Sequence, residues 1–381
     1  MKIKRFFKVV IFVLIFAFCF VGVQNLLTGD ADTRDHKRIE GFFDEKENSL
    51  DAVFLGSSAT YAFWTAPVAW VEYGLTVYSL SSSKQQILAA KYLIADARKT
   101  QPDALYIVNV ASVTEQYNAI NTHRLIFGYP YTENKYDMIN YLSELGGMSF
   151  SDRMEFYFPI IRFHDRWSDL VSFDFKKTTD AYKSASSYKS FLSKVEDVSG
   201  GLFDYEETAP ISETLTTGLN DLMDYCEQEQ VKVLFVVTPQ SLTDEEKRGQ
   251  QNTVMELIRS RGFDVLNMHE LVEEMDLDLT TDYYNGDHTN IHGSIKFTDY
   301  LSRYLIENYG FKDKRGTERL ASWDRAGEKY YNLISPYLTE EDLKYVSVEV
   351  VPEETTQEET TKLISDETDE TKPEITGDEI S

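Results

Sequence analysis

Short apolar runs that alternate with amphipathic segments limit this chain to few folds. Five runs are almost entirely apolar, at 51–56, 75–80, 104–110, 231–237 and 263–267. Apolar residues recur at helical spacing in the segments that follow, at 87–97, 219–228, 245–260 and 292–308. Strands that are apolar on both faces and alternate with helices form a parallel sheet covered by helices on both sides. We therefore predict an α/β fold.

The alternation is interrupted between 113 and 213, a stretch rich in tyrosine and phenylalanine. It is too long for a plain loop. We expect a largely helical insertion folded over the sheet, either a lid that shapes a substrate cleft or a packed subdomain without chemistry. The α/β domain is then expected to comprise 49–112 and 214–348.

An uncharged run of nineteen residues, 9–27, lies near the N-terminus. As a helix it would span about 28 Å, close to the thickness of a bilayer's hydrocarbon layer. Lysine and arginine precede the run, and aspartates follow it. The positive-inside rule then places 1–8 in the cytoplasm and the main domain outside, after a linker at 28–48. A cleaved signal peptide is the alternative, although the run lacks a small-residue cleavage site.

Charge and cysteine content argue against three kinds of protein. The net charge of −26 disfavours a nucleic-acid-binding protein, which needs basic residues to neutralise phosphates. Twelve acidic residues and two lysines lie in 349–381, which we predict to be a disordered tail. Cys19 and Cys226 are the two cysteines. Two cysteines so placed make neither a disulfide scaffold nor a zinc–thiolate site.

The first predicted strand ends in Gly56-Ser57-Ser58. In parallel α/β sheets, binding and catalytic sites form at the carboxyl ends of the strands. A serine at a strand-to-helix turn lies close to backbone N–H groups that can stabilise an oxyanion. A serine that only caps the next helix is the alternative.

A histidine, His288, lies in a polar turn just before the last predicted helix. A histidine that is held by a neighbouring side chain can deprotonate a serine. A metal site made of His288, His292 and Asp287 is the alternative. No carboxylate–histidine spacing elsewhere supports it, so we expect neither a metal nor a cofactor.

Gly56-Ser57-Ser58 and His288-Thr-Asn-Ile-His-Gly293 together resemble sequence blocks of the SGNH (GDSL-like) hydrolase superfamily. The resemblance covers about residues 50–112 and 215–308. It implies a three-layer, flavodoxin-like parallel sheet, with Ser58 as nucleophile and His288 as base. With its membrane anchor, the chain is similar to the cell-surface branch that acts in D-alanylation of lipoteichoic acid or that acylates and deacylates glycans.

The chain departs from the family pattern at two places. The family has aspartate three residues before the histidine, where this chain has Asn285. Asparagine can orient the imidazole ring but cannot offset its positive charge, and Asp282 could reach the ring instead. After the second and third strands the family has glycine and a G-x-N-D block. Here Ser82 and Asn109 are the candidates for binding the oxyanion or the substrate.

These expectations favour an extracellular, membrane-anchored serine esterase or O-acyltransferase. It would act on a cell-surface glycan or teichoic acid through an acyl-enzyme on Ser58. The resemblance also implies an integral-membrane acyl donor as a partner. The alternative, favoured by the two departures, is a catalytically inactive protein of the same fold that binds or assembles envelope components.

Overall fold

A computed structural model describes residues 2–28, 33–112, 119–170, 175 and 180–347. The predicted tail at 349–381 lies outside these ranges. The strands are β1 (Ala52–Gly56), β2 (Val77–Ser81), β3 (Leu105–Asn109), β4 (Val233–Val237), β5 (Val265–Asn267), β6 (Tyr283–Asn285) and β7 (His288–Thr289). The helices before β4 are α1 (Lys2–Thr28), α2 (Thr33–Phe43), α3 (Ser58–Phe63), α4 (Ala66–Tyr73), α5 (Ala90–Ala97), α6 (Ala119–Gly128), α7 (Glu133–Leu145), α8 (Phe150–Tyr157), α9 (Ile160–Phe163), α10 (Lys189–Ser193) and α11 (Glu213–Gln228). After β4 come α12 (Glu245–Ser260), α13 (Ile291–Tyr309) and α14 (Ala321–Ile334).

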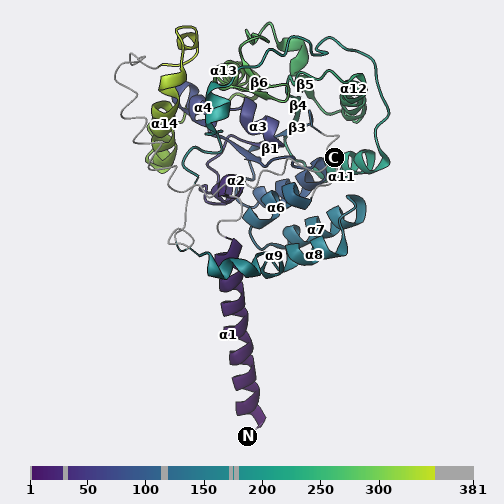
Figure 1. Ribbon diagram of the computed structural model, residues 1–381, viewed down its shortest axis with the longest axis vertical. Coiled ribbons are helices and arrows are strands. Elements are labelled where there is room, and N and C mark those ends of the chain that lie inside the picture. The colour runs from purple at the N-terminus through teal and green to yellow at the C-terminus, as the bar shows by residue number, and fades with distance from the viewer. Residues whose placement is uncertain (1, 29–32, 113–118, 171–174, 176–179, 348–381) are drawn as a thin grey trace.

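Five strands form one parallel sheet in the order β2-β1-β3-β4-β5 (Figure 1). Four strands lie within predicted apolar runs and β2 extends one residue beyond its run, so the α/β class and the parallel sheet are confirmed. β1 pairs with β2 on one side and β3 on the other, and Ala52 lies opposite both Val77 and Leu105. The strand order therefore reverses between β1 and β3. Such a switch point, at the carboxyl ends of the strands, is where α/β sheets bind ligands.

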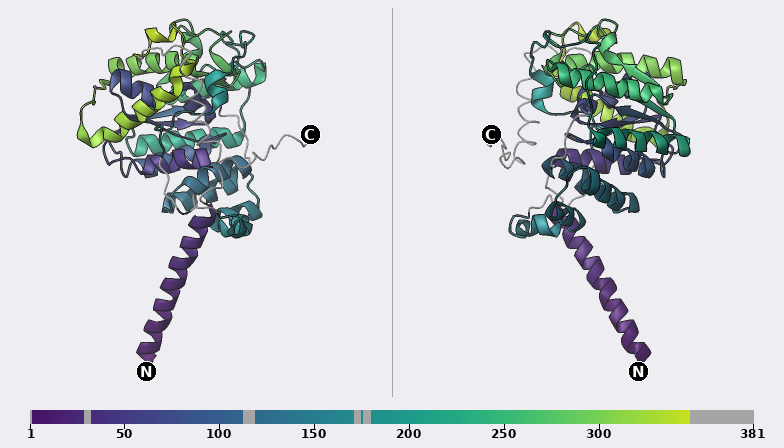
Figure 2. Two further views of the ribbon diagram at one scale, coloured as in Figure 1. Left: turned by 60° about the vertical axis from the view of Figure 1, so that its left-hand side comes forward. Right: turned by 90° about the vertical axis from the view of Figure 1, so that its right-hand side faces the viewer.

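Helices cover both faces of the sheet and give three layers (Figure 2). On one side lie α4, α13 and α14, and on the other lie α2, α5 and α11. Val53, Phe54 and Leu55 of β1 are completely buried between these layers. Burying one such side chain contributes about 1.5–3 kcal/mol, so the central strands anchor the core.

The predicted helices largely match those in the structure. α12 has the predicted bounds, and α13 extends one residue further at each end. α11 begins at Glu213, six residues earlier than expected, because the Ser212 hydroxyl accepts a hydrogen bond from the Leu215 amide at 3.1 Å and caps the helix. Gly218 then lies inside the helix, where Leu88 leaves no room for a larger side chain.

The stretch 28–48, which we expected to be a linker, contains α2. Ile39 and Phe42 of α2 are fully buried, and their helix packs against β2 and α6. The charged residues Asp35 and Arg38 are also buried, and they pair with each other. Because the two charges neutralise one another, a segment that looks polar in sequence can lie inside the protein.

The described residues between β3 and α11 contain helices, turns and irregular segments but no strand, and most of 180–212 is irregular. In this part of the chain, α6 to α9 lie between the sheet and the end of α1 (Figure 1). Within the described residues, α1 is the one helix that is long and apolar enough to cross a membrane. Most of this helix is exposed and projects away from the rest of the protein.

Candidate active site

Ser58 and His288 come together at the carboxyl edge of the sheet. Ser58 is the first residue of α3, directly after β1, and His288 begins β7. The distance between Ser58 Oγ and His288 Nε2 is 2.7 Å, a good hydrogen bond. Thr289, the next residue, donates from Oγ1 to the Ala62 carbonyl at 2.8 Å. The turn that carries the histidine is therefore bonded to the helix that carries the serine.

The turn before Ser58 requires a glycine. Gly56 has a φ of +154°, and a Cβ there would lie 2.3 Å from Thr60 Oγ1 and 2.8 Å from Asn109 Cβ. Any side chain would force β1 away from the end of β3 or from α3. The glycine thus lets the nucleophile turn lie directly against the neighbouring strand.

Asn285 holds the other side of the histidine ring. Its Oδ1 lies 2.8 Å from His288 Nδ1 and also accepts the Asp287 amide at 3.0 Å. The backbone donor fixes which amide atom is the oxygen, so Nδ1 must carry a proton when it bonds to Asn285. In the neutral ring, Nε2 is then the unprotonated nitrogen and faces the Ser58 hydroxyl.

Burial keeps the His288 ring neutral. Desolvation lowers the pKa of His288 to about 4, and the negative charge of Asp287 only partly opposes this. At neutral pH the ring is therefore a free base. Asn285 carries no charge, so it orients the ring without stabilising the imidazolium.

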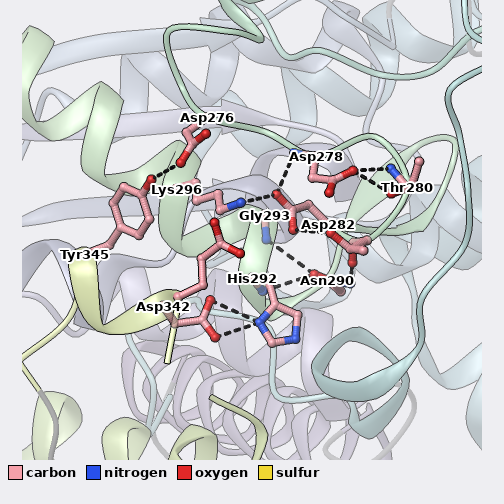
Figure 3. Close-up of polar contacts among 12 residues, drawn as sticks. Asp276, Asp278, Thr280, Asp282, Asn290, His292, Gly293, Lys296, Asp342 and Tyr345 are labelled. Atoms are coloured by element: carbon pink, nitrogen blue, oxygen red, sulfur yellow. Dashed lines mark hydrogen bonds and ion pairs between the residues drawn. The ribbon is translucent and has the colours of Figure 1, made fainter. Parts of the chain in front are cut away.

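Asp282 does not contact the His288 ring in the structure, although the sequence left it as an alternative to Asn285. Its carboxylate forms a buried ion pair with Lys296 at 2.8 Å and accepts the Asp278 amide at 2.8 Å (Figure 3). The structure places Asn285, and not Asp282, beside the ring.

The remaining motif residues after His288 shape the start of α13. The Asn290 side chain accepts hydrogen bonds from the amides of His292 and Gly293, at 3.0 and 3.3 Å (Figure 3). A Cβ at Gly293 would lie 2.3 Å from the Asp282 carbonyl oxygen. The two residues thus fix the helix start close to the β6–β7 hairpin and so position His288.

His292 contacts the C-terminal part of the domain. Its Nδ1 lies 2.8 Å from an oxygen of the buried Asp342 (Figure 3). Among the described residues, no three histidine, cysteine or acidic side chains are grouped so that they could hold a metal ion. The arrangement therefore gives no support to the alternative metal site.

Ser82 directly follows β2 and Asn109 ends β3, so both lie at the carboxyl edge of the sheet, and their side chains are already bonded. The buried Ser82 hydroxyl donates to Gln85 Oε1 at 3.2 Å. The Asn109 Nδ2 group donates to Thr60 at 3.3 Å and to Thr238 at 3.1 Å. Asn109 therefore ties β3 to α3 and to the end of β4, and binding an oxyanion would require it to give up a bond.

A small hollow of about 10 Å³, roughly the space of one water molecule, lies at the switch point between β1 and β3. Gly56, Ser57 and Asn109 form its floor, and Gln85 and Gln86 of the segment after β2 form part of its wall. The buried Oε1 atom of Gln86 has no hydrogen-bond partner. The hollow thus offers polar groups next to the nucleophile turn.

Sequence reasoning missed the aromatic residues around the histidine. The Phe191 ring lies 5.3 Å from the His288 ring and is stacked on Tyr284 at 4.6 Å. These rings help to exclude water and so contribute to the low pKa of His288. Phe191 lies in the long region between β3 and β4, and no spacing or motif there indicated this contact.

A second set of missed residues links α2 to the site. The Arg38 guanidinium lies 3.7 Å from the centre of the Tyr61 ring, one turn after Ser58. Its partner Asp35 accepts the Ser83 amide at 3.1 Å, just after β2. One ion pair thus supports both the serine helix and the loop that follows β2.

Comparisons of the chain with protein-family models, curated proteins and solved structures found no match.

Proposed function

We propose that this protein is a serine esterase or O-acyltransferase with an SGNH-like fold, in which 113–213 is a largely helical insertion. The proposal is supported chiefly by the hydrogen-bonded series Ser58, His288 and Asn285, in which a neutral imidazole faces a serine hydroxyl. A nucleophile, a base and a residue that orients the base are the parts that acyl transfer requires.

In the first half of the reaction, Ser58 Oγ attacks the carbonyl carbon of an ester and His288 Nε2 takes the hydroxyl proton. The carbon–oxygen bond to the leaving alcohol then breaks, and the imidazolium returns the proton to that alcohol. In the second half, water or an acceptor hydroxyl loses its proton to His288 and attacks the acyl-serine. Ser58 is released and regains the proton.

The oxyanion would be held by groups near the nucleophile turn. The backbone N–H of Ser58 lies in the first turn of α3, where helices leave amides without intrahelical partners. Asn109 could supply a second donor if its amide turned from Thr60 toward the substrate. The first step would therefore be slower than in a site whose donors are already free.

The cell surface is the proposed place of action. α1 is proposed to remain as a single-pass anchor, with the N-terminus in the cytoplasm and the main domain outside. A substrate attached to the envelope, such as a glycan or a teichoic acid, suits an enzyme that cannot diffuse away. An integral-membrane protein that supplies the acyl group is the proposed partner for transfer.

The alternative is a protein of this fold that binds an envelope polymer without chemistry. Two observations favour it: Asn285 is neutral, and both donors of the Asn109 amide are occupied. Under this alternative, replacing Ser58 would leave the protein's role unchanged.

Hydrolysis of p-nitrophenyl acetate by the full chain in detergent tests the proposal. We expect turnover that falls at least a hundredfold in Ser58→Ala and in His288→Ala. Ser260→Ala serves as the matched control, because its hydroxyl is at the exposed end of α12 and contacts only the Leu257 carbonyl. Faster release of p-nitrophenol on addition of a polyol would indicate transfer. Equal rates in all four proteins would contradict the proposal.

A further inference from the structure

The end of α1 is fixed to a small helical segment of the domain. Gln24, Leu27 and Thr28 are buried, although the helix before them is exposed. This last turn packs against α9 and the short 3-10 helix η2 (His164–Ser168). Arg166 of η2 donates a hydrogen bond to the Leu27 carbonyl. The position of α9 and η2 relative to the apolar helix is therefore defined by direct contacts.

Large apolar side chains are exposed on the same segment. We call α8, α9 and η2, residues 150–168, the interfacial platform. Its exposed members are Phe150 (77%), Phe158 (41%), Ile161 (46%) and Trp167 (72%). Figures 1 and 2 show the platform at the edge of the domain from which α1 leaves. Water-exposed aromatic groups at this density usually mark a surface that binds something.

We propose that the interfacial platform inserts these apolar side chains into the outer surface of the lipid bilayer that α1 crosses. The inference rests on the proposed role of α1 as a membrane anchor. The uncharged run 9–27 is just long enough for the hydrocarbon layer, so its end at Leu27 must lie near the membrane surface. Because α9 and η2 contact that end, they lie at the depth where tryptophan and other aromatic side chains are favoured.

The charges on the platform indicate that apolar insertion, and not attraction to anionic lipids, makes the contact. Arg162 pairs with Glu155 at 3.2 Å, and Arg153 donates to Asn140 at 2.8 Å. Arg166 is bonded to the end of α1. The platform holds three arginines and three acidic residues and so has no formal net charge. A bilayer of zwitterionic lipid should therefore be sufficient, and added salt should have little effect.

A second attachment would fix how the domain faces the membrane. A domain held by one helix can tilt, whereas one held by α1 and by the platform keeps a constant orientation. The edge of the sheet that carries Ser58 would then face a fixed direction relative to the surface on which its proposed substrate is displayed.

Tryptophan fluorescence tests the inference without labels, because Trp64, Trp70 and Trp323 are buried in the core and α1 contains no tryptophan. The full chain is reconstituted into phosphatidylcholine vesicles with bromine on the upper part of the acyl chains. We expect the Trp167 emission to be shifted to the blue and quenched by at least a third. Phosphatidylcholine brominated near the chain ends should quench less. Trp167→Phe should abolish the quenching.

A matched pair of variants tests whether the quenching depends on the apolar side chains of the platform. Phe158→Ser with Ile161→Ser removes two exposed apolar side chains of the platform and should reduce quenching at least twofold. Leu343→Ser removes one from the far part of the domain, where Leu343 is 39% exposed, and should change nothing. Circular dichroism checks that each variant is folded.

The inference is overturned if the chain floats with the vesicles but Trp167 keeps the emission of a water-exposed tryptophan and is not quenched. If the chain does not float with the vesicles, α1 does not anchor it in a membrane, and the inference is overturned as well. Neither result depends on ester hydrolysis, so the proposed activity is tested separately.

Discussion

His288 Nε2 lies 2.7 Å from Ser58 Oγ, although 230 residues separate them in the chain. Two local features maintain this distance. Gly56 lets the serine turn lie against β3, and the side chain of Asn290 caps the helix that follows the histidine. The hydrogen bond from Thr289 to Ala62 connects the two sides. The pair is therefore preorganised by its supporting residues, as acyl transfer requires.

Asn285→Asp should increase esterase activity. A carboxylate beside Nδ1 would stabilise the imidazolium that forms when Ser58 attacks, which the neutral amide does not do. One unit of pKa corresponds to about 1.4 kcal/mol, so we expect kcat/KM to rise about tenfold. Asn285→Ala should lower it by a similar factor because the ring is no longer oriented. A lower kcat/KM in Asn285→Asp than in the wild type would show that the amide is specifically required.

The pH dependence of kcat/KM should follow the low pKa of His288. The ring must be unprotonated to act as a base, so activity should rise with pH through about 4 and stay level from 5 to 7. In Asn285→Asp the nearby negative charge should raise this pKa and move the rise to higher pH. A wild-type midpoint near 6.5, the value of an unperturbed histidine, would contradict the account.

The domain should lose stability in mild acid. Burial lowers the pKa of His36 to about 4, that of His123 to about 3, and that of His269 well below 6.5. The unfolded chain therefore binds more protons than the folded one below pH 6.5, and the free energy of unfolding falls as pH drops from 6.5 toward 4. For His36 alone the loss is roughly 3 kcal/mol.

Thermal unfolding at several pH values measures this loss. His36→Gln should make the dependence less steep by the share of this one residue, since glutamine does not titrate. A melting temperature that is the same at pH 4.5 and pH 7 would contradict the expected linkage.

Removing either member of the Asp35–Arg38 pair should destabilise the protein. Arg38→Met leaves a buried carboxylate and Asp35→Asn leaves a buried guanidinium, each at a cost of about 3–5 kcal/mol. The double variant leaves neither charge, so it should be less destabilised than the sum of the single changes. Urea unfolding of the wild type, the two single variants and the double variant gives the coupling free energy between the two charges. Additive effects would mean that the two charges do not depend on each other.

The main sheet could be predicted because its strands are buried on both faces. Continuous apolar runs such as 231–237 carry that information within a few residues, and the glycine and polar residues that end them mark the edge of the sheet. Ser58 and His288 could be singled out because each stands at the end of a strand or the start of a helix, where parallel sheets place functional groups.

Other parts of the structure depend on contacts between residues that are distant in the chain, and no local sequence pattern indicates them. α2 looks polar because its buried charges are neutralised within the fold. Asp342 lies 50 residues after His292, and Phe191 comes from a region without a recognisable pattern. The choice between Asn285 and Asp282 depended on the ion pair that Lys296 forms with Asp282, which no spacing revealed.

Labelling with a fluorophosphonate probe tests the central claim most directly, because the probe reacts only with an activated serine. The full chain in detergent is treated with the probe, and the modified peptide is identified by mass spectrometry. We predict modification at Ser58, lost in Ser58→Ala and in His288→Ala and kept in Ser260→Ala. A folded chain that is not labelled, or that is labelled equally well without His288, would contradict the account.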